Sequence, residues 1–221
     1  MELSKEQIRE IIGKRVAKEL HEGDYVTLGI GLPTEAANYI PPNIHVMIHS
    51  ENGIIGIGAK PEADKIDSKI TNAGGQPVTL QTGAAFFDSQ TSFVMVRGGH
   101  IDATVLGALQ VDEEGNVANW MIPGVMIPGI GGAMDLVVGA KKVIVAMEHL
   151  AKNKIKILKR CTLPLTAAHE VDLIITERCV LRVTKEGLVL EEINPLFNLE
   201  EITSTIEAKL IIPPHLQNIA A

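Results

Sequence analysis

Near the start of the chain, apolar positions recur every three or four residues, which is the spacing of a helix with one buried face. They are Ile8, Ile11, Ile12, Val16 and Leu20. Ser4 and Gln7 stand just ahead in the Ser-x-x-Gln order of a capping box, in which each side chain accepts a backbone hydrogen bond. Gly23 is a helix terminator. The pattern therefore predicts an amphipathic helix that begins at Ser4 and ends before Gly23.

Short apolar runs alternate with turn and helix signals along the rest of the chain. Residues 25–28 lead directly into Gly29-Ile30-Gly31 and then Pro33, the order of a strand, a glycine turn and a helix start. We predict further strands at 44–48, 93–96, 103–106, 142–147 and 173–176, and helices at 33–39, 132–138 and 199–208. Residues 115–132 hold too much Gly and Pro for one regular element. This alternation predicts one α/β domain, residues 1–221, with a mostly parallel sheet.

Composition narrows the classes of function. The net charge of −7 and the scattered Lys and Arg argue against a nucleic-acid surface. We also expect no membrane span, because no apolar run approaches the ~20 residues needed, and the N-terminus lacks the order of a signal peptide. Cys161 and Cys179 match no metal or redox motif, so we expect reduced thiols in a cytoplasmic protein. With 3% aromatic residues, the core must be aliphatic, which suits buried parallel strands.

Three segments are predicted to meet at the carboxyl ends of the parallel strands, where ligands bind in such sheets. They are residues 29–31, 50–53 and 129–135. Glu51 would place a carboxylate beside glycine backbone there, although a glutamate at such a position is more often a solvated loop residue, so the position alone does not decide its role. The glycines of 129–132 can direct backbone N–H groups at a negative oxygen, or form a flexible connection. Gly29-Ile30-Gly31 lacks the third glycine of the dinucleotide-binding fingerprint.

Ser50-Glu51-Asn52-Gly53 resembles the Ser-Glu-Asn-Gly signature of class I CoA-transferase β subunits, which act on acetate, butyrate and 3-oxoacids. The resemblance covers nearly the whole chain. Further matching segments follow in order at residues 28–34, 72–75, 97–102, 106–112, 118–120, 131–137 and 161–166. The resemblance implies the three-layer α/β/α CoA-transferase (isomerase-like) fold.

The resemblance also implies the chemistry. Glu51 becomes the nucleophile that attacks an acyl-CoA thioester, in a ping-pong reaction through a glutamyl–CoA thioester. Gly132 and Ala133 become backbone donors to the oxyanion. Substrate contacts are implied at Gly29, Gly31, Asn52, Gly53, Asn72, Gly74 and Gly131. A short-chain carboxylic acid accepts CoA, an α subunit completes an α2β2 assembly, and neither metal nor prosthetic group is required, since CoA is a substrate.

Two departures and two alternatives remain open. Many relatives have Asn where Thr27 stands and some have Lys where Gly75 stands, which points to altered affinity or acyl preference. A non-catalytic domain of the same fold that binds a sugar phosphate or acyl-CoA is one alternative, and an acyl-CoA hydrolase is the other. His45 and His49 are predicted to share one strand face. Trp120 is interpreted as a core or subunit-interface anchor.

Overall fold

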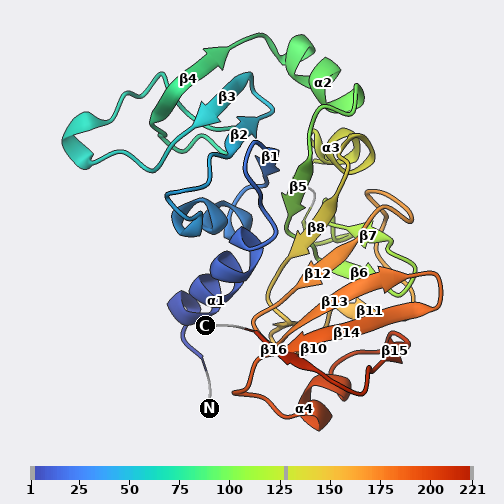
Figure 1. Ribbon diagram of the computed structural model, residues 1–221. Coiled ribbons are helices and arrows are strands. Elements are labelled where there is room, and N and C mark those ends of the chain that lie inside the picture. Colours follow the sequence, from blue (N-terminus) through green and yellow to red (C-terminus); the bar gives the residue numbers. More distant parts are fainter. Residues whose placement is uncertain (1–2, 127–128, 220–221) are drawn as a thin grey trace.

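The computed structural model describes residues 3–126 and 129–219, so residues 1–2, 127–128 and 220–221 lie outside the description (Figure 1). The helices are α1 (Lys5–Ala17), α2 (Ser89–Arg97), α3 (Ala133–Gly139) and α4 (Leu199–Thr203), with 3-10 helices η1 (Leu32–Tyr39) and η2 (Ala63–Lys65). The strands are β1 (Tyr25–Leu28), β2 (Met47–Ser50), β3 (Ile54–Ile57), β4 (Leu80–Phe86), β5 (Ala103–Leu106), β6 (Gln110–Asp112), β7 (Val117–Ala118), β8 (Val143–Ala146), β9 (Leu150–Ala151), β10 (Lys154–Ile155), β11 (Ile157–Leu158), β12 (Leu173–Ile175), β13 (Cys179–Thr184), β14 (Gly187–Ile193), β15 (Leu210–Ile211) and β16 (Gln217–Asn218).

One 11-stranded sheet forms the centre of the fold, in the order β15-β14-β13-β12-β8-β5-β1-β2-β3-β4, with β16 also paired to β14. Its middle strands, β12, β8, β5, β1 and β2, are all parallel. Antiparallel pairs join β12 to β13 and β14 on one side, and β2 to β3 and β4 on the other. The mostly parallel α/β sheet predicted from the sequence is therefore confirmed, with antiparallel flanks.

Strand β8 shows how the sheet is covered on both faces. Val143 and Val145 pack in one hydrophobic core with side chains of α2 and α3, whereas Ile144 packs in a second core with side chains of α1. Successive side chains of a strand point to opposite faces of the sheet, so helices cover both faces. Figure 1 shows α1 on one side of these strands and α2 with α3 on the other. The three-layer α/β/α arrangement is thus confirmed.

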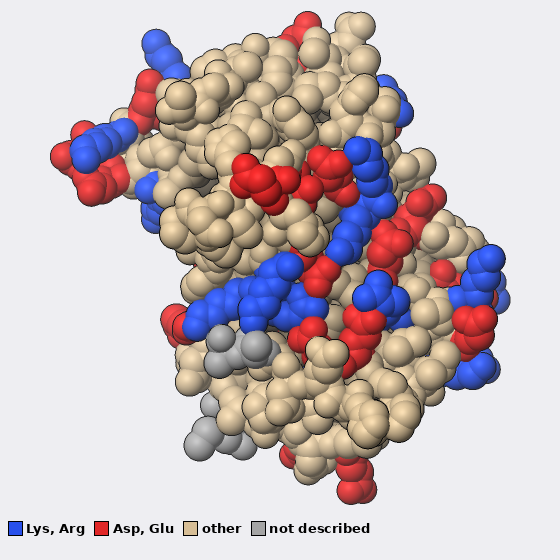
Figure 2. Space-filling view, viewed as in Figure 1, with Lys and Arg blue, Asp and Glu red and all other residues tan. Residues whose placement is uncertain are grey.

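Helix α1 begins as predicted and is joined to the sheet by ion pairs. Both hydrogen bonds of the capping box form between Ser4 and Gln7, but the helix ends at Ala17, earlier than the apolar spacing suggested. Arg15 donates to Glu192 of β14 at 2.8 and 2.7 Å and to Glu19 at 2.6 Å. In Figure 2, positive and negative side chains lie together in a band across the middle of the face shown.

The apolar run at residues 93–96 is part of a helix, so the strand predicted there is wrong. Asp88 caps α2 by accepting a hydrogen bond from the backbone N–H of Thr91. A run of four apolar residues fits either structure, and the cap upstream decides between them. Two other predictions were shifted or too long: β2 lies at Met47–Ser50 rather than 44–48, and α4 stops at Thr203 rather than 208.

The antiparallel flanks were not predicted at all. The hairpin of β13 and β14 turns through residues 185–186 and re-enters the sheet at Gly187, whose φ of 135° suits glycine. No helix within residues 3–126 and 129–219 is long and apolar enough to cross a membrane.

The irregular stretch predicted at 115–132 contains only the short strand β7 among its described residues, and residues 127–128 fall outside them.

Candidate active site

The carboxyl ends of three parallel strands are level with one another. Thr27 of β1 is paired with His49 of β2 and with Thr104 of β5. The residues that follow these strands therefore emerge at one edge of the sheet, and Glu51 is the first residue after β2. This is the edge at which parallel α/β sheets bind ligands.

The turn after Glu51 is held tightly. Strand β3 runs antiparallel to β2, so the chain reverses direction within residues 51–53. Gly53 has a φ of 109°, and a Cβ there would overlap the carbonyl oxygen of Phe87. Only glycine fits both conditions, because an L side chain at this φ is strained and has no space. The tight turn places Glu51 at its beginning rather than on a long, mobile loop.

The carboxylate of Glu51 lies directly against the backbone of residues 131–132. A Cβ at Gly132 would overlap Glu51 Oε2 and lie 2.7 Å from the Cζ of Phe93, and a Cβ at Gly131 would lie 4.0 Å from Glu51 Oε1. Glu51, Gly131 and Gly132 line a cavity of about 620 Å³ together with Gly29 and Ala133. The three segments predicted to converge at this edge do so.

The environment of Glu51 disfavours its charged form. Burial raises the pKa of the Glu51 carboxyl above its ordinary value; a hydrogen bond from the backbone N–H of Gly132 opposes this, and the negative charge of Asp135 adds to the increase. Asp135 is itself engaged, since Arg97 Nε of α2 donates to its carboxylate at 2.7 Å. A partly desolvated carboxylate that faces backbone N–H is suited to nucleophilic attack rather than to cation binding.

Removing the charge of Asp135 is expected to shift the acid limb of the pH–rate profile to lower pH. In Asp135→Asn the like charge near Glu51 is lost and Arg97 loses its partner, and both changes favour ionised Glu51, so its pKa falls. The acid limb of kcat/KM reports the free enzyme's essential base. Asp102→Asn is the matched control, because Asp102 pairs with Lys141 at 2.7 Å and is absent from the influences on Glu51. An unmoved limb in Asp135→Asn would refute this.

The two residues proposed as oxyanion donors differ in the structure. Gly132 is buried, and its N–H is directed at Glu51. The N–H of Ala133 already donates to the carbonyl oxygen of Ile130 at 3.2 Å, in the turn that precedes α3. A role for Ala133 as a donor therefore requires that this hydrogen bond be shared or broken, and both roles remain predictions.

Several of the residues predicted to contact substrate do not line this cavity. They are Gly31, Asn52, Gly53, Asn72 and Gly74. Asn52 Nδ2 donates to Thr71 O at 2.8 Å, and Asn72 Oδ1 accepts from the N–H groups of Gly74 and Gln76. These contacts give the two asparagines a role in holding loops, and their contacts with substrate remain predictions.

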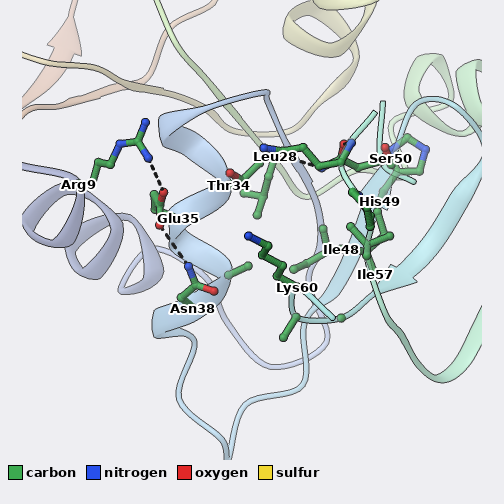
Figure 3. Close-up of a pocket in the computed structure, with 17 residues that line it drawn as sticks. Arg9, Leu28, Thr34, Glu35, Asn38, Ile48, His49, Ser50, Ile57 and Lys60 are labelled. Atoms are coloured by element: carbon green, nitrogen blue, oxygen red, sulfur yellow. Dashed lines mark hydrogen bonds and ion pairs between the residues drawn. The ribbon is translucent and has the colours of Figure 1, made fainter. Parts of the chain in front are cut away.

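A second cavity of about 430 Å³ adjoins the first, and Leu28 and Ser50 line both (Figure 3). Asn72 lines this second space. Figure 3 shows Lys60 extending across it toward η1, and the Arg9–Glu35 ion pair of 3.3 Å at its far end. The two cavities therefore meet at the ends of β1 and β2, directly before Glu51.

Several cavity residues were not predicted. Leu106 ends β5 and residues 107–109 follow it, in the same position relative to the sheet as Gly29 and Glu51. Their location after a predicted parallel strand was the signal that could have identified them. Trp120 is half-buried, lines the cavity and donates through Nε1 to Leu165 O at 3.2 Å. Its place in the wall of the cavity follows from the tertiary fold alone.

Known proteins resemble this chain closely. The family described as Coenzyme A transferase matches residues 9–205. The beta subunit of the acetate CoA-transferase of Haemophilus influenzae is 52% identical over 92% of both chains. One subunit of the succinyl-CoA:3-ketoacid coenzyme A transferase of Helicobacter pylori is 47% identical over 91% of this chain and 98% of that protein. The acyl-CoA transferase YdiF of Escherichia coli O157:H7 superimposes with a TM-score of 0.77 at 22% identity, over 99% of this chain and 44% of that chain.

Proposed function

The chain belongs to the coenzyme A transferase family, and on that premise we propose that it is a catalytic β subunit with Glu51 as its nucleophile. The reaction moves CoA from a short-chain acyl-CoA to an acceptor carboxylate of the acetate, butyrate or 3-oxoacid class. The single observation that carries the assignment of Glu51 is its carboxylate, which lies against the backbone of Gly132 in a cavity at the carboxyl edge of the sheet.

The first half of the reaction leaves CoA on the protein. A carboxylate oxygen of Glu51 attacks the thioester carbonyl carbon, and the C–S bond breaks. CoA leaves as a thiolate, and the acyl group stays on Glu51 as an acyl–glutamyl anhydride. The thiolate then attacks the glutamyl carbonyl of the anhydride. The first acid departs as its carboxylate, and a glutamyl–CoA thioester remains.

The second half runs through the same bonds in reverse. The acceptor carboxylate attacks the glutamyl carbonyl and expels CoA thiolate, which forms a second mixed anhydride. The thiolate then attacks the acceptor's carbonyl carbon, so the new acyl-CoA leaves and the carboxylate of Glu51 is regenerated. Charge and atoms balance without a proton donor, an oxidant or a metal.

The site supports this chemistry in two ways. Every attack creates a tetrahedral oxyanion, and a fixed N–H such as that of Gly132 stabilises it, typically by about 3 kcal/mol at the barrier. The cavity of about 620 Å³ also leaves room for the reacting end of an acyl-CoA beside Glu51. Binding energy from the long remainder of CoA, remote from the reacting carbon, can then be used in the transition state.

The proposal includes a partner subunit. Both of the close bacterial relatives are named as single subunits of their enzymes, and the Haemophilus influenzae relative is named as a beta subunit. The superimposed YdiF chain is more than twice the length matched. We therefore place this chain in an assembly with an α subunit, of α2β2 stoichiometry.

We further place it in the cytoplasm, which fits the free thiols of Cys161 and Cys179. That the reaction needs no prosthetic group stays a prediction.

Trapping the covalent intermediate tests the proposal. The chain is co-expressed with its α subunit and incubated with acyl-CoA but no acceptor acid, then treated with borohydride, which reduces a thioester and spares a free carboxylate. Peptide mass spectrometry is expected to find the Glu51 carboxyl reduced to an alcohol, only when acyl-CoA was present. An unmodified Glu51 in a complex that binds acyl-CoA would refute the mechanism. When acceptor acid is added before the borohydride, loss of the label together with formation of the new acyl-CoA distinguishes transfer from hydrolysis.

A further inference from the structure

His49 is a buried histidine whose two ring nitrogens both have partners. It lies on β2, two residues before Glu51, and is 1% exposed. Its Nδ1 is 2.9 Å from Thr27 Oγ1 on β1, and its Nε2 is 2.8 Å from Ser92 Oγ on α2. The ring also stacks on Phe87, with 6.2 Å between ring centroids. Figure 3 shows His49 beside Ser50 on β2, in the lining of the second cavity.

Helix α2 connects that ring to the opposite side of the active site. Phe93, the neighbour of Ser92, lies against Gly132, where an added Cβ would meet its ring at 2.7 and 2.9 Å. One helical turn further on, Arg97 donates to Asp135 of α3 at 2.7 Å. The same helix therefore contacts β2 through Ser92 and the glycine segment of residues 131–132 through Phe93.

Other contacts fix the position of α2 relative to the turn that begins at Glu51. The N–H of Phe87, just before the helix, donates to Gly53 O at 3.0 Å, so the turn that holds Glu51 is tied to the start of α2. Ser92 itself is 0% exposed. A buried hydroxyl without a partner is costly, so its hydrogen bond with the histidine is one that the fold has reason to keep.

We propose that His49 is a positioning residue, which through its hydrogen bond to Ser92 sets the distance between the nucleophile Glu51 and the glycine segment of residues 131–132. This inference rests on the proposed function of Glu51. His49 does not touch the reacting atoms. It fixes the position of α2 relative to β2, and α2 in turn holds Gly132 against the carboxylate of Glu51. A displacement of about 1 Å at such a site costs about 100-fold in rate.

The chemistry of the ring suits a fixed connector. Burial lowers the pKa of His49 to about 4, so the imidazole is neutral and donates through one nitrogen while accepting through the other. Serine and threonine hydroxyls can take either role, so both hydrogen bonds form in either tautomer. The connection therefore persists without a change of charge beside Glu51.

Two conservative variants separate the two hydrogen bonds of the ring. The amide nitrogen of glutamine occupies nearly the place of Nε2, so His49→Gln can keep the bond to Ser92 and lose the bond to Thr27. The amide of asparagine reaches only as far as Nδ1, so His49→Asn can keep the hydrogen bond to Thr27 and lose the hydrogen bond to Ser92. We expect His49→Asn to lower kcat by about 10- to 100-fold with KM for acyl-CoA little changed, and His49→Gln to stay close to wild type.

Ser92→Ala provides an independent route to the same result. It should reproduce the kcat loss of His49→Asn, and the double variant should be no slower than either single variant, because residues that act through one contact are not additive. His149→Asn is the matched control: His149 is 0% exposed, and its ring nitrogens also meet two hydroxyls, of Thr176 and Thr205. It should lower the melting temperature comparably while kcat is retained.

The experiment measures steady-state kcat and KM, the rate of borohydride-trapped label at Glu51 and the melting temperature, all on the co-expressed complex. Equal kcat in His49→Asn, His49→Gln and wild type would overturn the proposal, as would equal losses in both variants. If wild type itself gives no label at Glu51, the proposed function fails instead, so the two failures are distinguishable.

Discussion

Replacing Glu51 with glutamine is expected to lower kcat by roughly 10⁴-fold or more, because the amide cannot form the anhydride or the CoA thioester. The fold should tolerate the change. Since burial raises the pKa of the Glu51 carboxyl, the charged form is disfavoured in the folded protein, and a neutral isostere removes that cost. The melting temperature should therefore equal or slightly exceed that of wild type. Initial rates with acyl-CoA and acceptor acid, with thermal unfolding of the same samples, check both expectations.

Glu51→Asp serves as a graded comparison. Aspartate keeps a carboxylate but withdraws it by one methylene from Gly132, so we expect a loss smaller than that of glutamine, with measurable labelling by borohydride. If Glu51→Gln instead retained a substantial fraction of kcat, another residue would be the nucleophile.

Replacing Gly132 with alanine is expected to lower kcat by about 10²- to 10³-fold, the loss typical of an oxyanion donor that is displaced. Gly132 has a φ of −85°, which alanine adopts without strain, so the effect is steric. The added methyl would overlap Glu51 Oε2 and press on Phe93 at 2.7 Å, so the carboxylate or the 131–132 backbone must move. Steady-state kinetics and the rate of borohydride-trapped label at Glu51 measure the loss.

Gly107→Ala is the matched control for this substitution. Gly107 lines the same cavity, but a Cβ there has its nearest neighbour, Ala146 O, at 4.0 Å, an ordinary contact. It adds the same methyl to the same space without a clash, and it should cost far less than Gly132→Ala. Equal losses in the two variants would mean that cavity volume, rather than the position of Gly132 against Glu51, controls the rate.

Elements with strong local signals were predictable. The capping box at Ser4 and Gln7 forms as expected, and the strands at 25–28 and 103–106 lie where the apolar runs placed them. The 93–96 run was wrong because four apolar residues fit a strand or a helix equally, and the deciding signal, the Asp88 cap, lies five residues upstream. That error concealed α2, the helix that joins β2 to the glycine segment of the site.

The sequence by itself determined that Glu51 follows an apolar strand, that glycine segments follow neighbouring strands, and that these meet at one edge of a parallel sheet. It did so because strand and turn preferences are local, and parallel strands share a carboxyl edge. Only the tertiary structure decided that Gly132 is the residue facing the carboxylate, that the Ala133 N–H is already bonded to Ile130, and that His49 meets Ser92. The contacts of Gly132 with Glu51 and of His49 with Ser92 join residues far apart in sequence, and such contacts depend on how helices pack on the sheet.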